Sequence, residues 1–174
     1  MTTQLIAERG FWGLSMQDVA DGCGLTVPGL LHHVGSKDNL LVAVLEHRDD
    51  QDHRSLATSL GRPLADLPGA VPLPEICLAL VRRNAGQPEI VRLFAVLEAE
   101  SLAPDHPAHE YFRARQERTI KVMTMLAKAH GVAEPETLAR QIMALMDGLQ
   151  IQWLRDPEGI DLVATWAAAA KALF

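Results

Sequence analysis

The sequence is poor in aromatic residues and has little cysteine. Aromatic side chains make up 5% of its 174 residues, whereas hydrophobic residues make up 48%, and this aliphatic, alanine- and leucine-rich composition favours helices. The two cysteines, Cys23 and Cys77, lie far apart without CxxC spacing, which excludes a disulfide framework and a cysteine zinc site. We expect both to be small buried side chains.

Segments that would direct the chain to a membrane are also missing. No apolar run approaches the roughly 18 residues that a membrane span needs, and residues 1–10 lack the layout of a signal peptide. We therefore expect a cytoplasmic protein. No P-loop, GxSxG or strand-linked GxGxxG motif is present, and no nucleophile stands beside a base, so the sequence predicts neither an enzyme nor a cofactor.

Basic charge is scarce. The net charge is −6, and residues 1–60 hold four basic side chains against eight acidic ones. Proteins that bind nucleic acid usually present a basic surface. If this chain binds DNA, its contacts must therefore be local and set by geometry.

Proline and glycine mark the joints between predicted helices. A stretch rich in both, residues 61–74, separates short N-terminal helices from longer segments. In the longer segments apolar residues recur with the helical period, and proline stands near four of their starts. These segments run Pro74–Asn84, Pro88–Leu102, Pro107–His130, Pro135–Arg155 and Ile160–Phe174. No alternating run indicates a strand, so the sequence predicts an all-α fold.

Residues 15–37, SMQDVADGCGLTVPGLLHHVGSK, have the features of a helix-turn-helix. Ser15 and Thr26 are expected to cap two short helices. Ala20 supplies the small residue where the helices cross, and Gly24 the left-handed residue of the turn, with the following leucine filling the corner. A purely structural helical hairpin is the alternative that this spacing leaves open.

These residues are similar to those of the TetR family of bacterial regulators. Close matching covers about residues 5–45, and beyond them only the helical layout and two short phrases, residues 147–150 and 156–158, agree. The matching residues are Gly10-Phe11, Ser15-Met16, Asp18-Val19-Ala20, Gly24-Leu25-Thr26, Leu30-Leu31-His32-His33-Val34, Ser36-Lys37-Asp38 and Leu40-Leu41.

The resemblance implies a function as well as a fold. It implies a three-helix DNA-binding head, residues 1–45, fused to a helical ligand-binding and dimerisation domain, residues 46–174. Such a protein is a homodimeric transcriptional repressor that a small-molecule effector releases from its double-stranded operator. The chain departs from the family at Leu31, where a tyrosine is usual, and at Val34, where an aromatic residue is usual. It also begins inside the expected first helix, so either the start is trimmed or DNA is contacted less broadly.

The recognition helix of this motif presents its first residues to base edges in the major groove. Val27 and Pro28 offer apolar contacts, the two histidines offer donors, and Lys37 offers a phosphate contact. The predicted DNA-binding residues are Gln17, Thr26, Val27, Pro28, Gly29, His32, His33 and Lys37. For the two histidines, a partly buried pair beneath the next helix is the alternative.

Two further predictions concern the body. An apolar ligand pocket is predicted from residues that could equally be plain core: Phe94, Leu97, Tyr111, Phe112, Met123, Met143, Met146 and Trp153. A dimer seam through the last two helices is predicted from two apolar stripes, with burial inside one subunit as the alternative. The stripes are Leu138 to Trp153, and Ile160, Val163, Ala167, Ala170 and Phe174.

A helical metal- or small-molecule-binding protein that does not bind DNA specifically is the alternative function. His106, His109 and Glu110 lie close together in the sequence, and His47 and His53 flank acidic residues. The first two histidines straddle Pro107 rather than sharing a helix face, and no cysteine is near. The spacing therefore predicts no metal site.

Overall fold

Side-chain caps open the first helices of the computed structural model, which describes residues 10–174. The Ser15 hydroxyl accepts the Asp18 amide at 3.0 Å where α2 (Met16–Cys23) begins. Thr26 accepts the amide of Gly29 at 3.2 Å at the start of α3 (Val27–Val34). Ser36 does the same before α4 (Lys37–Ser59). Each cap satisfies an amide that has no partner within its helix, so the predicted caps are confirmed.

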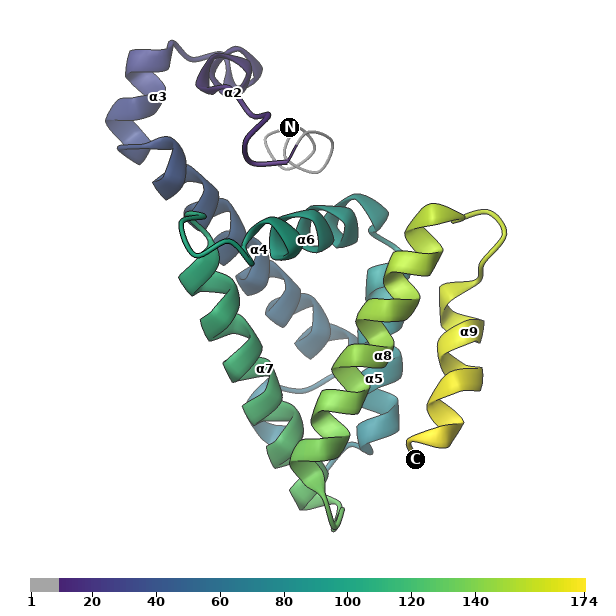
Figure 1. Ribbon diagram of the computed structural model, residues 1–174. Coiled ribbons are helices and arrows are strands. Elements are labelled where there is room, and N and C mark those ends of the chain that lie inside the picture. The colour runs from purple at the N-terminus through teal and green to yellow at the C-terminus, as the bar shows by residue number, and fades with distance from the viewer. Residues whose placement is uncertain (1–9) are drawn as a thin grey trace. The chain divides into compact units, whose positions relative to one another are not determined.

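The remaining helices begin and end within a few residues of the predicted segments. They are α5 (Leu73–Ala85), α6 (Pro88–Glu100), α7 (His109–Ala129), α8 (Pro135–Arg155) and α9 (Leu162–Ala169), with 3-10 turns η1 (Leu64–Asp66) and η2 (Ala170–Ala172) (Figure 1). Pro107 lies before α7, where turns at His106 and His109 lead into the helix. Residues 10–174 contain no strand, and the all-α fold class is confirmed.

The chain folds as two compact units. Unit 1 consists of residues 1–51 and 89–113, of which residues 10–51 and 89–113 are described, and unit 2 consists of residues 52–88 and 114–174. Two long helices, α4 and α7, contribute residues to both units. The predicted functional boundary between residues 45 and 46 falls inside α4, and that division stays a prediction.

The core of unit 1 joins segments that are far apart in the sequence. Phe11, Leu41 and Leu45 pack with Leu93 and Leu97 of α6 in one buried cluster. The side chains in this cluster are between 0 and 8% exposed. Helices α2 and α3 and the start of α4 therefore share a core with α6 and the start of α7.

The turn between α2 and α3 closes differently from the prediction. Gly24 has the expected left-handed backbone, with φ of +67°, and Ala20 is fully buried where the helices pack. The side chain of Leu25, however, is 41% exposed and does not fill the corner. Its amide donates to the Ala20 carbonyl at 2.9 Å instead, so a backbone bond and a small residue close the turn. Cys23, at the end of α2, is exposed, and the expectation that it is buried was wrong.

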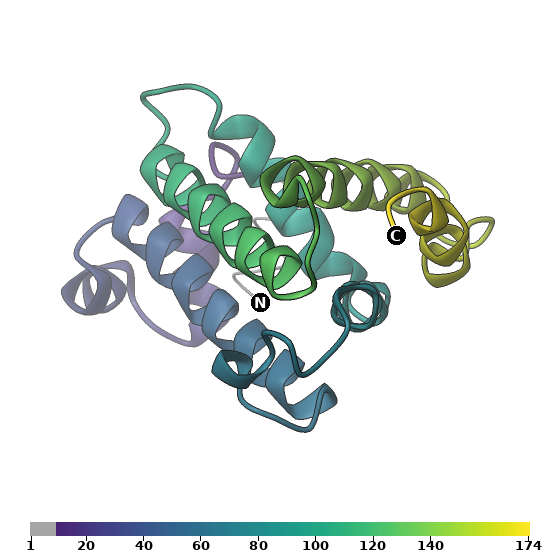
Figure 2. The ribbon, with the colours of Figure 1, turned by 90° about the horizontal axis from the view of Figure 1, so that it is seen from below.

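Unit 2 is built around α5, α8 and α9. The last helix packs against both others, and α8 and α9 lie side by side when viewed along the bundle (Figure 2). Ile76, Ile142 and Trp166 are at most 2% exposed. Cys77 is buried here as expected, and burial raises the pKa of its thiol to about 12. Among the described residues, no helix is long and apolar enough to cross a membrane.

Candidate nucleic-acid interface

The two faces of α3 differ in character. Leu30 is buried, and Val27 and Val34 pack partly against the unit 1 core. The opposite face exposes Pro28, Leu31 and His32, at the i, i+3, i+4 spacing that places residues together on a helix. The inward face fixes α3 on the core while the outward face is left open to a partner.

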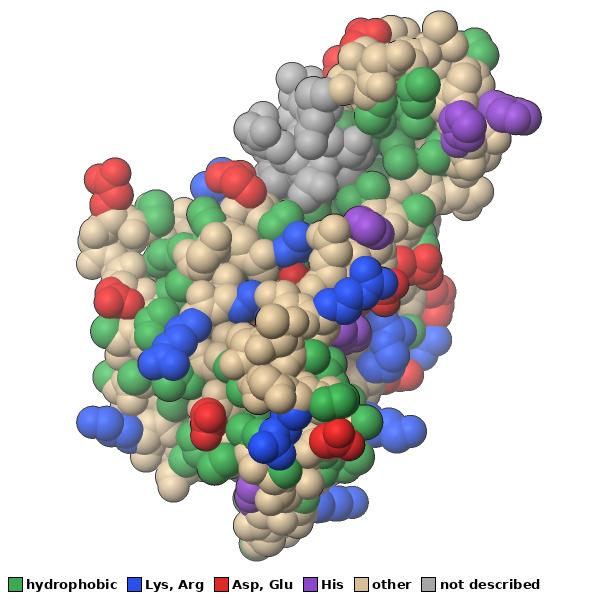
Figure 3. Space-filling view, turned by 180° about the vertical axis from the view of Figure 1, so that it is seen from behind, with side chains coloured by type: hydrophobic (Ala, Val, Ile, Leu, Met, Phe, Trp, Pro, Cys, Tyr) green, Lys and Arg blue, Asp and Glu red, His purple; other side chains and the backbone are tan. Residues whose placement is uncertain are grey.

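His32 and His33 are both exposed. Their rings meet edge to face with centroids 5.7 Å apart. Figure 3, which colours histidine side chains purple, shows histidines protruding from the surface. The alternative of a partly buried pair is therefore wrong. A neutral imidazole offers one N–H donor and one acceptor, so this pair suits hydrogen bonds to base edges or phosphates.

The other residues predicted at the start of the motif are divided between structural and surface roles. Gln17 is exposed on α2, and its amide donates to Asp21 at 2.6 Å. Val27 is half-buried, so only part of its side chain faces outward. A Cβ at Gly29 would lie 3.2 Å from the Thr26 hydroxyl oxygen, which is a tight contact. Glycine at this position therefore leaves room for the Thr26 cap.

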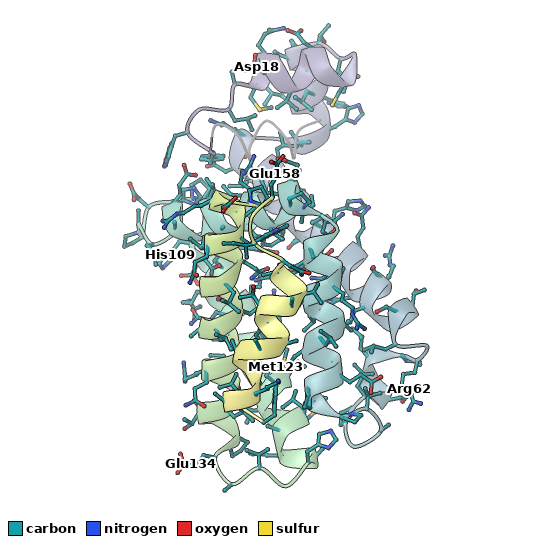
Figure 4. All side chains as sticks on the ribbon, turned by 90° about the vertical axis from the view of Figure 1, so that its right-hand side faces the viewer. Asp18, Arg62, His109, Met123, Glu134 and Glu158 are labelled. Atoms are coloured by element: carbon teal, nitrogen blue, oxygen red, sulfur yellow. The ribbon has the colours of Figure 1, made fainter. Side chains whose placement is uncertain are left out.

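Charge around the motif is sparse and mixed. Lys37 is the one lysine or arginine between residues 10 and 47. It is half-buried at the first position of α4, and its ammonium lies 4.4 Å from the centroid of the Phe11 ring. Asp18, labelled in Figure 4, stands in the first turn of α2. A carboxylate there stabilises the helix end but repels a phosphate.

Two exposed residues were not among the predicted contacts. Leu31 is 37% exposed on the outward face of α3, and Asn39 is exposed in the first turn of α4. The sequence could have indicated Leu31, because it lies three residues after Pro28 and therefore on the same face of the helix. No sequence signal indicated Asn39, because its exposure depends on where α4 begins, and the Ser36 cap fixes that start.

The predicted ligand-binding residues fall into two groups. Phe94, Leu97, Tyr111 and Phe112 lie in unit 1, where the rings of Phe94 and Phe112 are 6.1 Å apart. The others belong to unit 2: Met123 (Figure 4) and Trp153 are buried, whereas Met143 and Met146 are half-buried. A role of either group in ligand binding stays a prediction.

A buried polar chain in unit 2 was not foreseen. Arg83 of α5 donates to the Asp52 carbonyl at 3.1 Å and lies 3.7 Å from its carboxylate. The Arg83 guanidinium also donates to the Asn84 side chain at 3.0 Å, and Asn84 reaches Gln150 of α8. Asp52 and Gln150 are both under 9% exposed. These residues are too far apart in the sequence for spacing to indicate their contact.

The histidines of the metal alternative have partners within the protein. The Nδ1 atom of His106 accepts the Ala108 amide at 3.1 Å, and His109 donates from Nδ1 to the Ser101 carbonyl at 2.8 Å. Glu110 pairs with Arg113 at 2.7 Å, and this bond lowers the pKa of the Glu110 carboxyl. Within residues 10–174, no three His, Cys, Asp or Glu side chains gather as a metal site would require.

Comparison with known proteins agrees with this geometry. Residues 2–44 match the family described as "Bacterial regulatory proteins, tetR family". No curated protein sequence matches the chain.

Solved structures share the fold over nearly the whole chain. A protein assigned as a TetR-family transcriptional regulator from Rhodococcus sp. superposes with a TM-score of 0.71 at 20% identity, covering 99% of this chain and 93% of that one. NalD, the secondary repressor of the MexAB-OprM multidrug efflux pump in Pseudomonas aeruginosa, gives 0.69 at 21%, covering 99% and 89%. AibR, solved with isovaleryl coenzyme A and operator DNA, gives 0.66 at 22%, covering 96% and 90%.

The matched segment contains the capped α2 and α3 and the start of α4. The rest of the chain has the helical fold of the superposed regulators. Residues 2–44 are thus similar to the tetR family of bacterial regulatory proteins, and residues 10–174 share the helical fold of solved regulators of that type.

Proposed function

We propose that this protein is a homodimeric transcriptional repressor that binds operator DNA through α3 and leaves it when a small molecule binds the helical body. The observation that carries the proposal is the capped α2–α3 pair inside the matched segment, with one face of α3 packed on the core and the other exposed. NalD is a repressor, and AibR was solved with both operator DNA and a small acyl-coenzyme A. Both support a regulator of this type.

DNA contact is proposed for the residues predicted from the sequence, with Leu31 and Asn39 added. Pro28 and Leu31 would meet apolar groups such as a thymine methyl, and His32 and His33 would donate to base edges or phosphates. Lys37 and the amide ends of α3 and α4 would hold phosphates, because helix N-termini carry partial positive charge. With one lysine in the motif, we expect affinity to depend weakly on salt.

The last two helices are proposed as the dimer interface, on a face of α8 that differs from its predicted stripe and a face of α9 that keeps only Ala167 of its predicted stripe. Leu138, Ile142 and Trp153 are buried within the protomer, and so is Ala170 of the second stripe. This burial follows the predicted alternative for those residues. The opposite face of α8 exposes Ala144, Gly148 and Ile151 at i, i+4, i+7, and α9 exposes Ala164, Ala167 and Ala168. Small residues on a helix let a second helix approach closely.

A DNA selection experiment tests the proposed function. From a pool of random duplexes, the protein should enrich a two-fold symmetric sequence whose half-sites are about 34 Å, one helical turn, apart. His32→Ala and His33→Ala should weaken binding to the selected duplex. His47→Ala, which removes an exposed histidine from α4, is the matched control and should bind as the wild type does. A protein that enriches no sequence is not an operator-binding repressor.

A further inference from the structure

Glu100, the last residue of α6, contacts the backbone at the start of the described chain. Its carboxylate accepts the Phe11 amide at 2.9 Å, across 89 residues of sequence. Its other oxygen lies so close to Gly10 that a Cβ at that position would collide with it, and Gly10 also has a φ of +67°. The Gly10–Phe11 peptide is thus held against an acidic side chain from a distant helix.

This position is an unfavourable one for a carboxylate. The C-terminus of a helix carries partial negative charge, so an acidic residue there is repelled by the helix end. The last turn of α6 contains no basic residue that would offset this repulsion. The Glu100 carboxylate therefore does not stabilise its own helix. Its described contacts are with Gly10, Phe11 and His106.

The side chain of Phe11 contacts Lys37, at the end of the predicted DNA-binding motif. Its ring is 2% exposed and receives the Lys37 ammonium at 4.4 Å from the centroid. A cation over an aromatic face is attracted by the ring's quadrupole. Lys37 is the first residue of α4 and lies three residues after the end of α3, so the Phe11 ring sets where this ammonium lies near the recognition helix.

His106 packs against both Glu100 and Phe11. It is 3% exposed, and because its Nδ1 accepts the Ala108 amide, the neutral ring carries its proton on Nε2. That atom lies 3.7 Å from the Glu100 carboxylate. The ring also meets Phe11 and Trp12 edge-on at 5.3 and 5.7 Å. Aromatic surroundings of low polarity strengthen the bond between Glu100 and the Phe11 amide.

We propose that Glu100 is a positioning residue for DNA binding: by holding the Gly10–Phe11 peptide, it fixes the Phe11 ring on which the Lys37 ammonium rests. The proposal rests on the proposed function, since Lys37 is the residue expected to meet a phosphate. Glu100 itself touches no DNA. It acts through Phe11. Removing its carboxylate should therefore move the Lys37 ammonium while the Lys37 residue and its charge stay the same.

Lysine NMR on the free protein measures this directly. The lysines are Lys37, Lys121, Lys128 and Lys171, and reductive ¹³C-methylation labels their Nζ atoms. The Lys37 signal, assigned by its loss in Lys37→Arg, should stand upfield of the others because of the Phe11 ring current. Glu100→Ala should move it toward the others, and Glu100→Gln, which keeps an acceptor oxygen, should restore it. Glu98→Gln, two residues earlier on α6, is the control and should leave it unchanged.

Binding of the unmethylated variants to the selected duplex gives the functional readout. Glu100→Ala should bind roughly tenfold more weakly, as for one charge-assisted hydrogen bond, with most of the affinity regained in Glu100→Gln. Should Glu100→Ala fail to fold, Phe11→Leu decides, because it keeps the backbone amide but removes the ring. It should abolish the upfield shift and weaken binding by a similar factor.

The outcomes separate this inference from the proposed function. A wild-type chain that selects no DNA contradicts the proposed function, and the Lys37 signal then still shows whether Glu100 holds the contact. A wild-type chain that binds while Glu100→Ala binds equally well contradicts the inference alone. An unmoved Lys37 signal in Glu100→Ala also overturns it, whatever the affinity.

Discussion

The side-chain amide of Asn84 donates to the Oε1 atom of Gln150 at 2.6 Å and so connects α5 to α8 inside unit 2. Gln150 is 8% exposed, and its own amide reaches Asp147 at 3.4 Å. On the other side, Asn84 accepts from Arg83. A buried polar chain of this kind is stable only while each member keeps its partner.

Replacing Gln150 by leucine should therefore destabilise the protein even though leucine is apolar and of similar size. The half-buried Asn84 amide would lose its acceptor, at a cost of roughly 1 kcal/mol. Urea unfolding followed by circular dichroism measures the change. Gln116→Leu, on the exposed face of α7, should stay within about 0.5 kcal/mol of the wild type. Equal stability of both variants would show that the Asn84–Gln150 bond contributes nothing net.

Lys37→Ala should weaken binding to the selected duplex and to unrelated duplexes by the same factor. A phosphate contact carries no sequence information, whereas the outward face of α3 does. Loss of one such contact should lower the slope of log affinity against log salt by about one unit. Pro28→Ala should instead change which sequence is preferred, with little change in the slope. A salt slope that Lys37→Ala leaves unaltered would remove Lys37 from the phosphate contacts.

Ala167→Glu should convert the proposed dimer into monomers. Ala167 is exposed on α9, and a carboxylate at a helix–helix seam would be desolvated without a partner, which costs several kcal/mol. The dissociation constant should rise more than 100-fold in sedimentation equilibrium. Ala103→Glu, an exposed loop position in unit 1, is the control for added charge. If both variants remain dimeric, this face of α9 is not the seam. Ala170 is unsuitable for the test, because it is buried within the protomer.

The pH dependence of stability should carry a contribution from His106. Burial lowers the pKa of its imidazole below the ordinary 6.5, although the nearby Glu100, Asp105 and Asp38 raise it and His109 lowers it further. The unfolded chain therefore takes up a proton more readily than the folded chain as pH falls through 6.5. Stability contributed by the neutral ring is fully present above that pH and is lost below it.

The matched variant for this prediction is His106→Asn, whose side-chain carbonyl offers the Ala108 amide an acceptor that does not titrate. Between pH 7 and pH 5, its stability should fall less steeply than that of the wild type, by up to about 1.4 kcal/mol per pH unit. His53→Asn, at an exposed position of α4, should follow the wild-type curve. Parallel curves for wild type and His106→Asn would mean that His106 takes up its proton equally in both states.

Features that depend on neighbours in the sequence were predictable, and features that depend on distant residues were not. The caps at Ser15, Thr26 and Ser36 each reach an amide three residues on, so local chemistry sets the helix starts. The bond from the Phe11 amide to Glu100 spans 89 residues of sequence, and the bond from Asn84 to Gln150 of α8 spans 66. Apolar periodicity showed which residues of α8 form its inner face, but it could not show that this face packs within the protomer.

The last prediction concerns release from DNA. Leu97 and Phe112, both predicted to line a ligand site, belong to the same buried cluster as Phe11 and Leu41. Protein interiors are close-packed, so a ligand that displaced them would have to repack the core on which α2, α3 and the start of α4 rest. We therefore expect a small, largely apolar ligand to favour a state in which the recognition helix is wrongly placed.

A ligand can shift the two states only by its difference in affinity for them. Coupling of about 1–3 kcal/mol would weaken operator binding roughly 5- to 150-fold, and by linkage the operator must weaken ligand binding by the same factor. The probe is a small apolar compound chosen by its thermal stabilisation of the protein, titrated calorimetrically with and without the selected duplex. Leu97→Ala should reduce its affinity, whereas Leu102→Ala, at a 79% exposed position, should not. Equal ligand affinity with and without DNA would leave a constitutive repressor whose body serves dimerisation alone.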